Sequence, residues 1–145
     1  MLALIQRVTS ASVQINKETV GQIGLGLLVF LGIEKDDEKT DADKLLNKVL
    51  AYRIFSDDED KMNLSVRDVQ GGLLIISQFT LVAGTNLGLR PSFTSAKSPQ
   101  KAEELYQYFL DQAQNKYDPI ASGKFGAVMQ VSLVNDGPVT FLLNI

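Results

Sequence analysis

The fold of this chain is organised around the segment Gly71-Gly72-Leu73-Leu74-Ile75-Ile76-Ser77-Gln78-Phe79-Thr80-Leu81. Consecutive large aliphatic residues entered through two glycines predict a central strand that is buried on both faces. Ser77, Gln78 and Thr80 interrupt the apolar run near its end. A buried polar group costs about 1–3 kcal/mol when it has no hydrogen-bond partner. These side chains therefore need either backbone partners or a ligand.

Three further strands are predicted before this segment. Gly24 to Ile33 is a continuous apolar run bounded by charge, and its length favours a strand over a buried helix. Leu2 to Val8 and Ala11 to Ile15 are short runs of β-prone residues. The amino-terminal part of the chain is therefore expected to consist of strands only.

Two amphipathic helices are predicted from their caps and apolar spacing. Thr40 is expected to cap the first helix, with Asp43 at the third helical position and the apolar pattern ending at about Tyr52. Ser98-Pro99 is expected to start the second helix, because serine is a favoured cap and proline fits the first helical position. The second helix is expected to end near Tyr117.

The carboxyl end is predicted to contain two strands, residues 127–133 and 139–143, joined by a turn over residues 134–138. Residues 83–95 are predicted to form a loop. The resulting element order is βββαβαββ. Helices that are separated from runs of strands favour an α+β fold with mainly antiparallel β-sheets over a doubly wound parallel sheet. The whole chain, residues 1–145, is expected to form a single domain.

Composition excludes several classes of function. The chain has 145 residues, a formal net charge of −3, no cysteine and no histidine. A thiolate nucleophile, an imidazole base and a Ser-His-Asp triad are thereby excluded. The apolar runs are shorter than the roughly 20 residues that span a bilayer, and the first residues lack a secretory pattern. We expect a cytoplasmic protein, not bound to membranes, whose mature chain starts near Met1.

No metal or cofactor is predicted. The acidic run Asp57 to Asp60 lacks the alternating carboxylates and the glycine of a calcium loop, so a solvated turn explains it. Thr80 as a nucleophile would need a lysine, a carboxylate or the substrate itself as its base. The Ser77, Gln78 and Thr80 side chains could equally serve only to satisfy nearby backbone groups.

Two other segments have both a structural and a functional interpretation. Asn135-Asp136-Gly137-Pro138-Val139-Thr140 is typical of a hairpin turn and is also a candidate binding motif. Phe125 and Met129, in a segment that also contains Gly123 and Gly126, could stack on a flat ring such as a nucleobase, or could simply be core residues.

Taken together, residues 77–81 and 135–140 resemble the two signature motifs of the D-aminoacyl-tRNA deacylases. The resemblance covers the full length of the chain and neither motif departs from the family pattern. It extends over further segments, namely Arg7-Val8, Ala11-Ser12-Val13, Gly26-Leu27-Leu28, Arg53-Ile54-Phe55, Lys61-Met62-Asn63, Gly88-x-Arg90-Pro91-Ser92-Phe93 and Gly123-x-Phe125-Gly126-Ala127-x-Met129.

This resemblance implies a homodimer that hydrolyses the ester between a D-amino acid and the terminal adenosine of tRNA, a proofreading reaction of translation. It also implies activity on glycine mischarged onto alanine tRNA. By resemblance, a cis Gly137-Pro138 peptide enters the partner's pocket and rejects L-substrates, and Arg7 orients that motif. The resemblance further implies a reaction centre lined by Ser77, Gln78, Phe79 and Ala102, with Thr80 in the same motif, and an adenine site at Phe125 and Met129.

The absence of histidine favours attack by water, assisted by the ribose hydroxyl of the substrate and the main chain near Phe79 and Thr80, over a covalent Thr80 intermediate. Two other functions stay open: a noncatalytic homodimeric module that binds RNA ends or nucleotides, and an esterase or amidase for small D-amino acid derivatives that acts through Thr80. Basic residues of the less acidic half are candidates for phosphate contacts, namely Arg90, Lys97, Lys101, Lys116 and Lys124.

Overall fold

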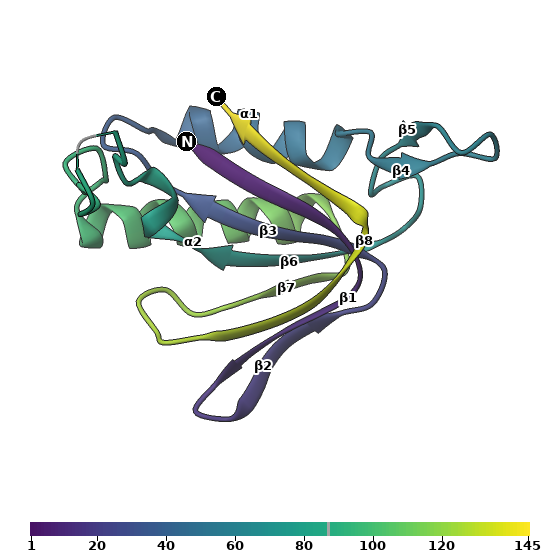
Figure 1. The fold of residues 1–145 in the computed structure, drawn as a ribbon, viewed down its shortest axis with the longest axis horizontal. Coiled ribbons are helices and arrows are strands. Elements are labelled where there is room, and N and C mark those ends of the chain that lie inside the picture. Colours follow the sequence, from purple (N-terminus) through teal and green to yellow (C-terminus); the bar gives the residue numbers. More distant parts are fainter. Residues whose placement is uncertain (87) are drawn as a thin grey trace.

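The computed structural model describes residues 1–86 and 88–145. A curved sheet has both helices on one of its faces (Figure 1). Leu87, within the predicted loop 83–95, lies outside the described residues. The elements are β1 (Leu2–Ile15), β2 (Glu18–Ile23), β3 (Gly26–Gly32), α1 (Lys39–Ala51), β4 (Phe55–Ser56), β5 (Met62–Leu64), β6 (Gly72–Ser77), the 3₁₀ helix η1 (Phe79–Val82), α2 (Pro99–Lys116), β7 (Ile120–Ser122) and β8 (Gln130–Asn144).

The main sheet is mixed in direction. β1 is antiparallel to β2, β3 and β8, whereas β6 is parallel to β3 and to β7. β4 and β5 form a separate hairpin. The α+β class is confirmed, although the sheet contains more parallel pairing than the sequence predicts.

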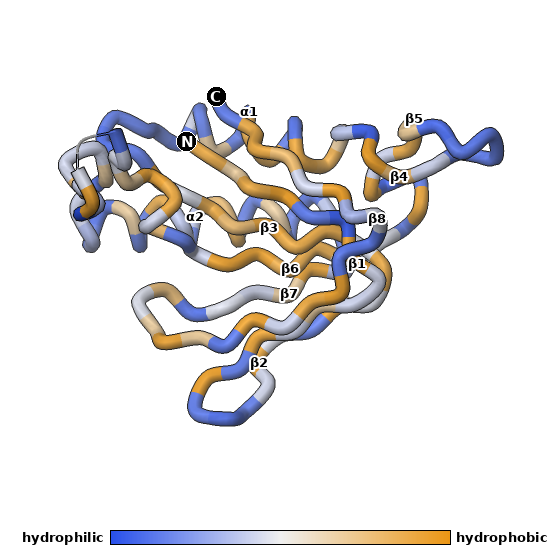
Figure 2. The backbone as a smooth tube through the Cα atoms, in the orientation of Figure 1, coloured by the Kyte–Doolittle hydropathy of each residue, from blue (hydrophilic) through white to orange (hydrophobic). Residues whose placement is uncertain are grey.

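The central strands β3 and β6 are buried on both faces, as their uninterrupted apolar sequences predict (Figure 2). Leu73 and Ile75 of β6 belong to a cluster shared with both helices. Leu74 and Ile76 belong to a second cluster, which packs with residues of β1 and β2. The predicted central strand is therefore confirmed, but it ends at Ser77, and the next residues form η1 instead of continuing the strand.

The close approach of the β3 and β6 backbones explains why residue 26 is a glycine. A Cβ atom at Gly26 would lie 2.0 Å from the carbonyl oxygen of Gly72. Only glycine permits the parallel pairing of β3 with β6 at this position.

The amino-terminal strand predictions are corrected in two respects. The two predicted runs before residue 16 form one strand, β1, because β8 pairs along both halves of it. β2 was not predicted, because its sequence is mostly polar and exposed and its hydrophobic alternation is weak. Asn16 and Lys17, both with positive φ, make the turn between the two strands.

The second helix is confirmed, with Ser98 as its cap and its end before Tyr117. The start of the first helix was predicted two residues too late. Glu38 is the cap, and the carboxylate of Asp41 accepts the Glu38 backbone N–H at 3.0 Å. Glu38 and Asp41 therefore cap the helix through reciprocal side-chain to backbone hydrogen bonds, in place of the expected threonine cap. Glutamate is rarely found at the cap position. Within the described part of the chain, no helix has the length and apolar character to cross a membrane.

The carboxyl-terminal prediction is wrong in its topology. Residues 130–144 form the single strand β8, which pairs with β1 on both sides of residues 136–139. The predicted turn is a bulge, because both flanking segments continue along the same long partner strand. The short strand β7 was also not predicted. Over residues 1–86 and 88–145 the observed element order is thus βββαβββαββ, with one 3₁₀ helix before α2.

Candidate functional site

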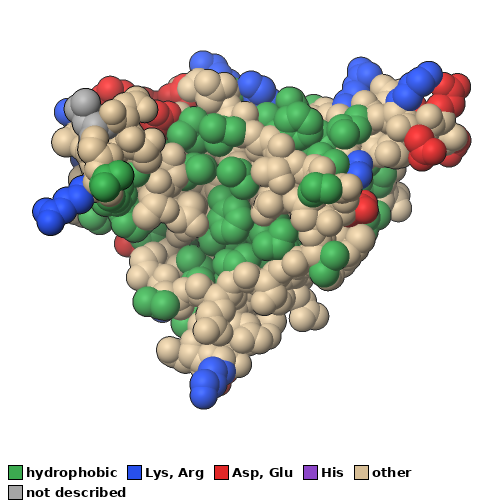
Figure 3. Space-filling view, viewed as in Figure 1, with side chains coloured by type: hydrophobic (Ala, Val, Ile, Leu, Met, Phe, Trp, Pro, Cys, Tyr) green, Lys and Arg blue, Asp and Glu red, His purple; other side chains and the backbone are tan. Residues whose placement is uncertain are grey.

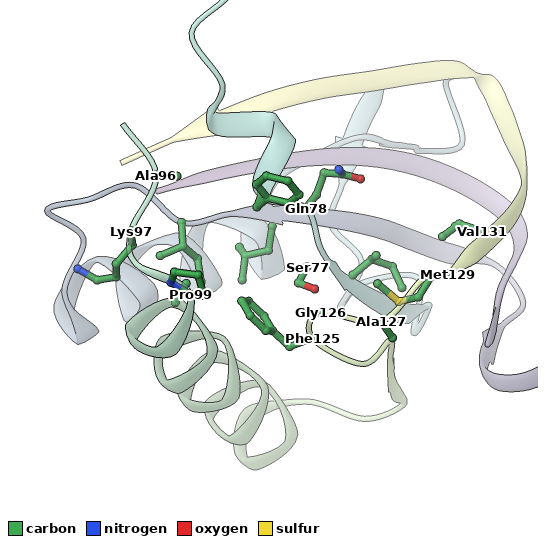
Figure 4. Close-up of a pocket in the computed structure, with 15 residues that line it drawn as sticks. Ser77, Gln78, Ala96, Lys97, Pro99, Phe125, Gly126, Ala127, Met129 and Val131 are labelled. Atoms are coloured by element: carbon green, nitrogen blue, oxygen red, sulfur yellow. The ribbon is translucent and has the colours of Figure 1, made fainter. Parts of the chain in front are cut away.

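A cavity of about 470 Å³ lies at the end of β6, between the start of α2 and the segment that leads into β8 (Figure 4). In Figure 4 the side chains of Ser77, Phe125 and Met129 point into the same space. The cavity is lined by Leu31, Ile33, Ile76, Ser77, Gln78, Phe79, Ala96, Lys97, Pro99, Ala102, Phe125, Gly126, Ala127, Met129 and Val131.

The polar edge of this pocket is formed where β6 ends. The backbone N–H of Gln78 donates to the carbonyl oxygen of Leu31 at 2.8 Å, which ties the end of β6 to β3. The Gln78 side-chain amide donates to the hydroxyl of Thr80. In the first turn of η1, the N–H groups of Phe79 and Thr80 have no acceptor within the helix. The polar edge of the pocket therefore lies at the start of η1, whose first residue, Phe79, also lines the pocket.

The opposite wall of the pocket is apolar. Phe125 and Met129 are partly buried, and Ala102, in the first turn of α2, is 8% exposed. The small side chain of Ala102 leaves space where a larger residue would fill the cavity. A flat apolar group fits this wall better than a charged one.

The two residues Ala96 and Lys97, before α2, and its first residue, Pro99, belong to the pocket, which the sequence did not predict. Ala96, Lys97 and Pro99 line it. The Nζ atom of Lys97 donates to the carbonyl oxygen of Lys35 at 2.7 Å, and in Figure 4 it points away from Ser77. The proline that starts α2 was visible in the sequence, but nothing there indicated that this helix end closes a cavity.

The second predicted motif forms a bulge that projects from β8. Between the pairs Gln6–Thr140 and Val8–Asn135, only Arg7 of β1 lies opposite residues 136–139. The Gly137–Pro138 peptide bond is cis, as the resemblance implies. Both residues are exposed.

Arg7 holds the base of this bulge. Its Nε donates to the carbonyl oxygen of Asp136 at 2.9 Å, and one terminal guanidinium nitrogen donates to the carbonyl oxygen of Ile54 at 2.7 Å. The Asp136 carboxylate lies 3.4 Å from Nε. The charged side chain therefore ties the bulge to the segment that enters β4.

Asn135 closes the bulge from its other side. Its side-chain oxygen accepts the N–H of Val139 at 2.6 Å, and its amide nitrogen donates to the hydroxyl of Thr140 at 3.0 Å. Gly137 has φ of 141°, and a Cβ atom there would lie 2.6 Å from the Cγ2 atom of Val139. The conformation of the bulge therefore requires glycine at this position.

The structure divides the predicted site residues into two groups. The pocket contains Ser77, Gln78, Phe79, Ala102, Phe125 and Met129. Thr80 lies next to the pocket through its bond with Gln78. Arg7, Gly137 and Pro138 do not line the pocket and belong to the bulge.

Thr80 is poorly placed as a nucleophile. Among the described residues its side-chain hydroxyl is hydrogen-bonded to Gln78 and to no lysine or carboxylate. Within the same residues no three carboxylate side chains gather as ligands of a metal ion. The polar groups at this edge of the pocket are the side chains of Ser77 and Gln78 and the backbone at the start of η1.

The architecture matches that of a solved structure. A solved structure described as a probable eukaryotic D-amino acid tRNA deacylase superimposes with a TM-score of 0.82, covering 99% of this chain and 98% of that chain at 16% identity. At that identity the likeness shows the fold alone.

The chain belongs to the D-Tyr-tRNA(Tyr) deacylase family, whose model matches residues 4–144. It is therefore a hydrolase of the ester-cleaving class. A D-aminoacyl-tRNA deacylase of Haemophilus influenzae (strain PittEE) is 60% identical over 145 residues, which cover 100% of both chains. A solved structure described as c-Myc DNA Unwinding Element Binding Protein is 42% identical, with a TM-score of 0.95 over 100% of this chain and 99% of that chain.

Proposed function

We propose that this chain hydrolyses the ester bond of D-aminoacyl-tRNA in the cytoplasm and releases a free D-amino acid and tRNA. The observation that carries this proposal is the pocket that joins the Ser77-Gln78-Phe79 motif to the Phe125 and Met129 wall. Its volume of about 470 Å³ falls within the range of small-molecule sites. The full-length identity with D-aminoacyl-tRNA deacylases supports the same substrate class.

The terminal adenosine occupies the apolar wall in this proposal. The Phe125 ring and the thioether of Met129 are both suited to contact with a flat base. The ester then lies towards Ser77 and Gln78, at the polar edge. This orientation brings the reacting carbonyl to the start of η1.

Hydrolysis requires no imidazole in this arrangement. An aminoacyl ester is already an activated acyl group, so positioning and stabilisation of the oxyanion supply much of the rate. The backbone N–H groups of Phe79 and Thr80 are the proposed donors to the oxyanion. Water attacks the carbonyl carbon, and the ribose hydroxyl of the substrate assists the proton transfer. Thr80 holds the Gln78 side chain and forms no covalent intermediate.

Chiral selection requires a second copy of the chain in our proposal. Within one protomer, Gly137 and Pro138 do not line the pocket. Both residues are exposed on the surface of the protomer, where a second copy of the chain can contact them. In a two-fold homodimer, the bulge of each protomer enters the pocket of its partner and excludes an L side chain. Glycine, which has no side chain, passes this filter, so glycyl-tRNA(Ala) is also a substrate.

An exposed hydrophobic surface supports self-association. Hydrophobic side chains gather in the middle of the face seen in Figure 3. On β8, Val134 and Leu142 are each 57% exposed, and Phe141 is 36% exposed. An uncovered patch of this kind is typical of a protein interface. Sedimentation analysis at micromolar concentration is expected to give a dimer, and a monomer would contradict the cross-subunit filter.

Contacts with tRNA are proposed only at its acceptor end. Lys97 lines the pocket, and Lys101 lies in the first turn of α2. Lys116 lies at the opposite end of α2, beside Asp43 and Asn47, so we exclude it from the predicted phosphate contacts. Binding should weaken as salt rises, because phosphate contacts release counterions.

The decisive test compares hydrolysis of D-tyrosyl-tRNA, L-tyrosyl-tRNA and glycyl-tRNA by the purified protein. We expect rapid loss of the D-ester and of the glycyl ester, with survival of the L-ester. Equal cleavage of the D- and L-esters would disprove the chiral filter. Thr80→Ala is expected to keep most of the activity, and its inactivity would favour an esterase that acts through Thr80.

A noncatalytic module that binds nucleic-acid ends is the second candidate. One observation favours it, namely the likeness to a structure described as a DNA unwinding element binding protein. This alternative predicts that tRNA binds and that no aminoacyl ester is hydrolysed. The same assay, combined with a tRNA-binding measurement, therefore separates the two functions.

A further inference from the structure

Tyr106 of α2 and Tyr117, the residue that follows α2, bind backbone carbonyl groups at opposite ends of β6. The hydroxyl of Tyr106 lies 3.0 Å from the carbonyl oxygen of Ile75 and 3.2 Å from that of Gly123. The hydroxyl of Tyr117 donates to the carbonyl oxygens of Val66, at 2.9 Å, and Gly71, at 2.5 Å. The two contacts have the same chemistry, but only that of Tyr106 is at the pocket end of the strand.

Tyr106 contacts the pocket wall in two ways. Its ring centroid lies 5.8 Å from that of Phe125, with an angle of 44° between the rings. Its hydroxyl holds Gly123, and a Cβ atom at Gly123 would lie 2.5 Å from the sulfur of Met129. The position of Gly123 therefore sets how closely Met129 approaches the strand.

The Tyr106 hydroxyl is suited to a fixed structural contact. The side chain is 2% exposed and does not itself line the pocket. Burial raises the pKa of Tyr106 far above its ordinary value, while a backbone hydrogen bond from Ser77 opposes the rise. The hydroxyl therefore remains protonated and donating at neutral pH.

We propose that Tyr106 is a positioning residue that sets the distance between the Phe125 and Met129 side chains and the end of β6, and thereby the affinity of the pocket for adenine. The proposal rests on the proposed function for the identity of the bound base. Tyr106 itself touches no substrate, since it acts through Phe125, Gly123 and Met129.

Tyr106→Phe and Tyr117→Phe form a matched pair for the test. Each change deletes one hydroxyl that lies within hydrogen-bond distance of two backbone carbonyl oxygens, so each should lower the melting temperature. We expect Tyr106→Phe alone to raise the KM for D-tyrosyl-tRNA and the Kd for adenosine monophosphate roughly three- to tenfold. We expect kcat to stay within about twofold of wild type, because the reacting groups are untouched.

A structural readout that is independent of activity uses the methionine methyl groups. The chain has 3 methionines, so a spectrum of methyl-labelled protein contains few signals, and Met129→Leu identifies the signal of Met129. Tyr106→Phe is expected to shift the Met129 signal while leaving those of Met1 and Met62 in place. Tyr117→Phe is expected to leave the Met129 signal unmoved.

Equal changes of KM and of the Met129 signal in both variants would overturn the proposal, because they would reflect general destabilisation. An unmoved Met129 signal with unchanged nucleotide affinity in Tyr106→Phe would overturn it as well. If wild-type protein binds the nucleotide without hydrolysing D-tyrosyl-tRNA, the proposed function fails, while the nucleotide and methyl measurements still decide the role of Tyr106.

Discussion

The pocket and the bulge are built in opposite ways. The pocket is assembled from the end of β6, the start of α2 and residues 125–131, which are distant in sequence and meet through apolar packing. The bulge consists of consecutive residues of β8 held by polar side chains, chiefly Asn135 and Arg7. One region depends on side-chain volume, and the other depends on individual hydrogen bonds and backbone conformation.

This difference follows from their exposure to solvent. A cavity wall rests on the hydrophobic core, so packing holds it in place. Gly137 and Pro138 are exposed, so burial does not hold them in place. Specific bonds must therefore supply the rigidity that a selective motif needs. We expect changes in the bulge to alter the rate and the selectivity, and changes in the pocket wall to alter mainly the binding of substrate.

The largest effect is expected from Gly137→Ala. The new Cβ atom would clash with Val139 at a φ of 141°, which is strained for alanine. Displacement of the bulge should lower kcat/KM for D-tyrosyl-tRNA by on the order of 100-fold. Gly88→Ala is the control, because Gly88 also has positive φ but has open space around it. Equal losses in the two variants would indicate a general cost of positive φ and no role for the bulge.

Phe125→Ala should have the next largest effect. The loss of a stacking surface is expected to raise KM by roughly tenfold, since an aromatic contact with a base contributes about 1–3 kcal/mol. The ratio of D- to L-ester hydrolysis should not change, because the bulge is intact. Val128→Ala is the control, as Val128 is 90% exposed and does not line the pocket. A changed ratio of D- to L-ester hydrolysis in Phe125→Ala would show that the pocket wall also affects chiral selection, which would contradict the separate roles of the pocket and the bulge.

Asn135→Ala should have a smaller effect than Phe125→Ala. It tests how much one side chain, apart from the backbone conformation, stabilises the bulge. It removes the acceptor for Val139 N–H, so kcat/KM should fall roughly three- to tenfold. Asn135→Asp keeps that acceptor and should recover part of the loss. If the aspartate variant were no better than the alanine variant, the bond to Val139 would not support the bulge.

The smallest effect is expected in the pH dependence of stability, through the amino group of Met1. Burial lowers the pKa of the Met1 amino group, but hydrogen bonds to Asp37 and Glu34 outweigh burial and raise it above 8.0. The stabilisation is complete below pH 8 and is lost as pH rises through the higher folded-state pKa. The melting temperature should then fall by a few degrees. Asp37→Asn should reduce this pH dependence, and an unchanged profile would contradict the role of the ion pair.

Much of the fold could be predicted, because several elements depend on strong local signals. Proline at the start of α2 and the uninterrupted apolar residues of β6 were sufficient to identify both elements. β2 and β7 were not predictable in the same way, because neither has a strong hydrophobic pattern of its own. They are strands only because the edges of β1 and β6 are available to pair with them.

The sequence also indicated which residues belong to the candidate site better than it indicated how they are arranged in space. Ser77, Gln78, Phe125 and Met129 were expected on residue type and family resemblance, and they meet in one pocket. Ala96 was missed, and Lys97 was expected only as a phosphate contact, because their segment reaches the pocket only through the packing of α2. Tyr106 was missed for a related reason, since a buried tyrosine on an apolar helix face is indistinguishable from any other core residue.

The sequence by itself determined the secondary-structure class, the absence of histidine chemistry and the two motifs, because these depend on local residue type and order. Only the tertiary structure decided that residues 134–138 form a bulge instead of a hairpin, since that depends on whether both flanking segments pair with the same strand, β1. It likewise decided that one motif lines a cavity while the other projects from the surface. Long-range pairing and packing bring distant residues together, and no local pattern encodes them.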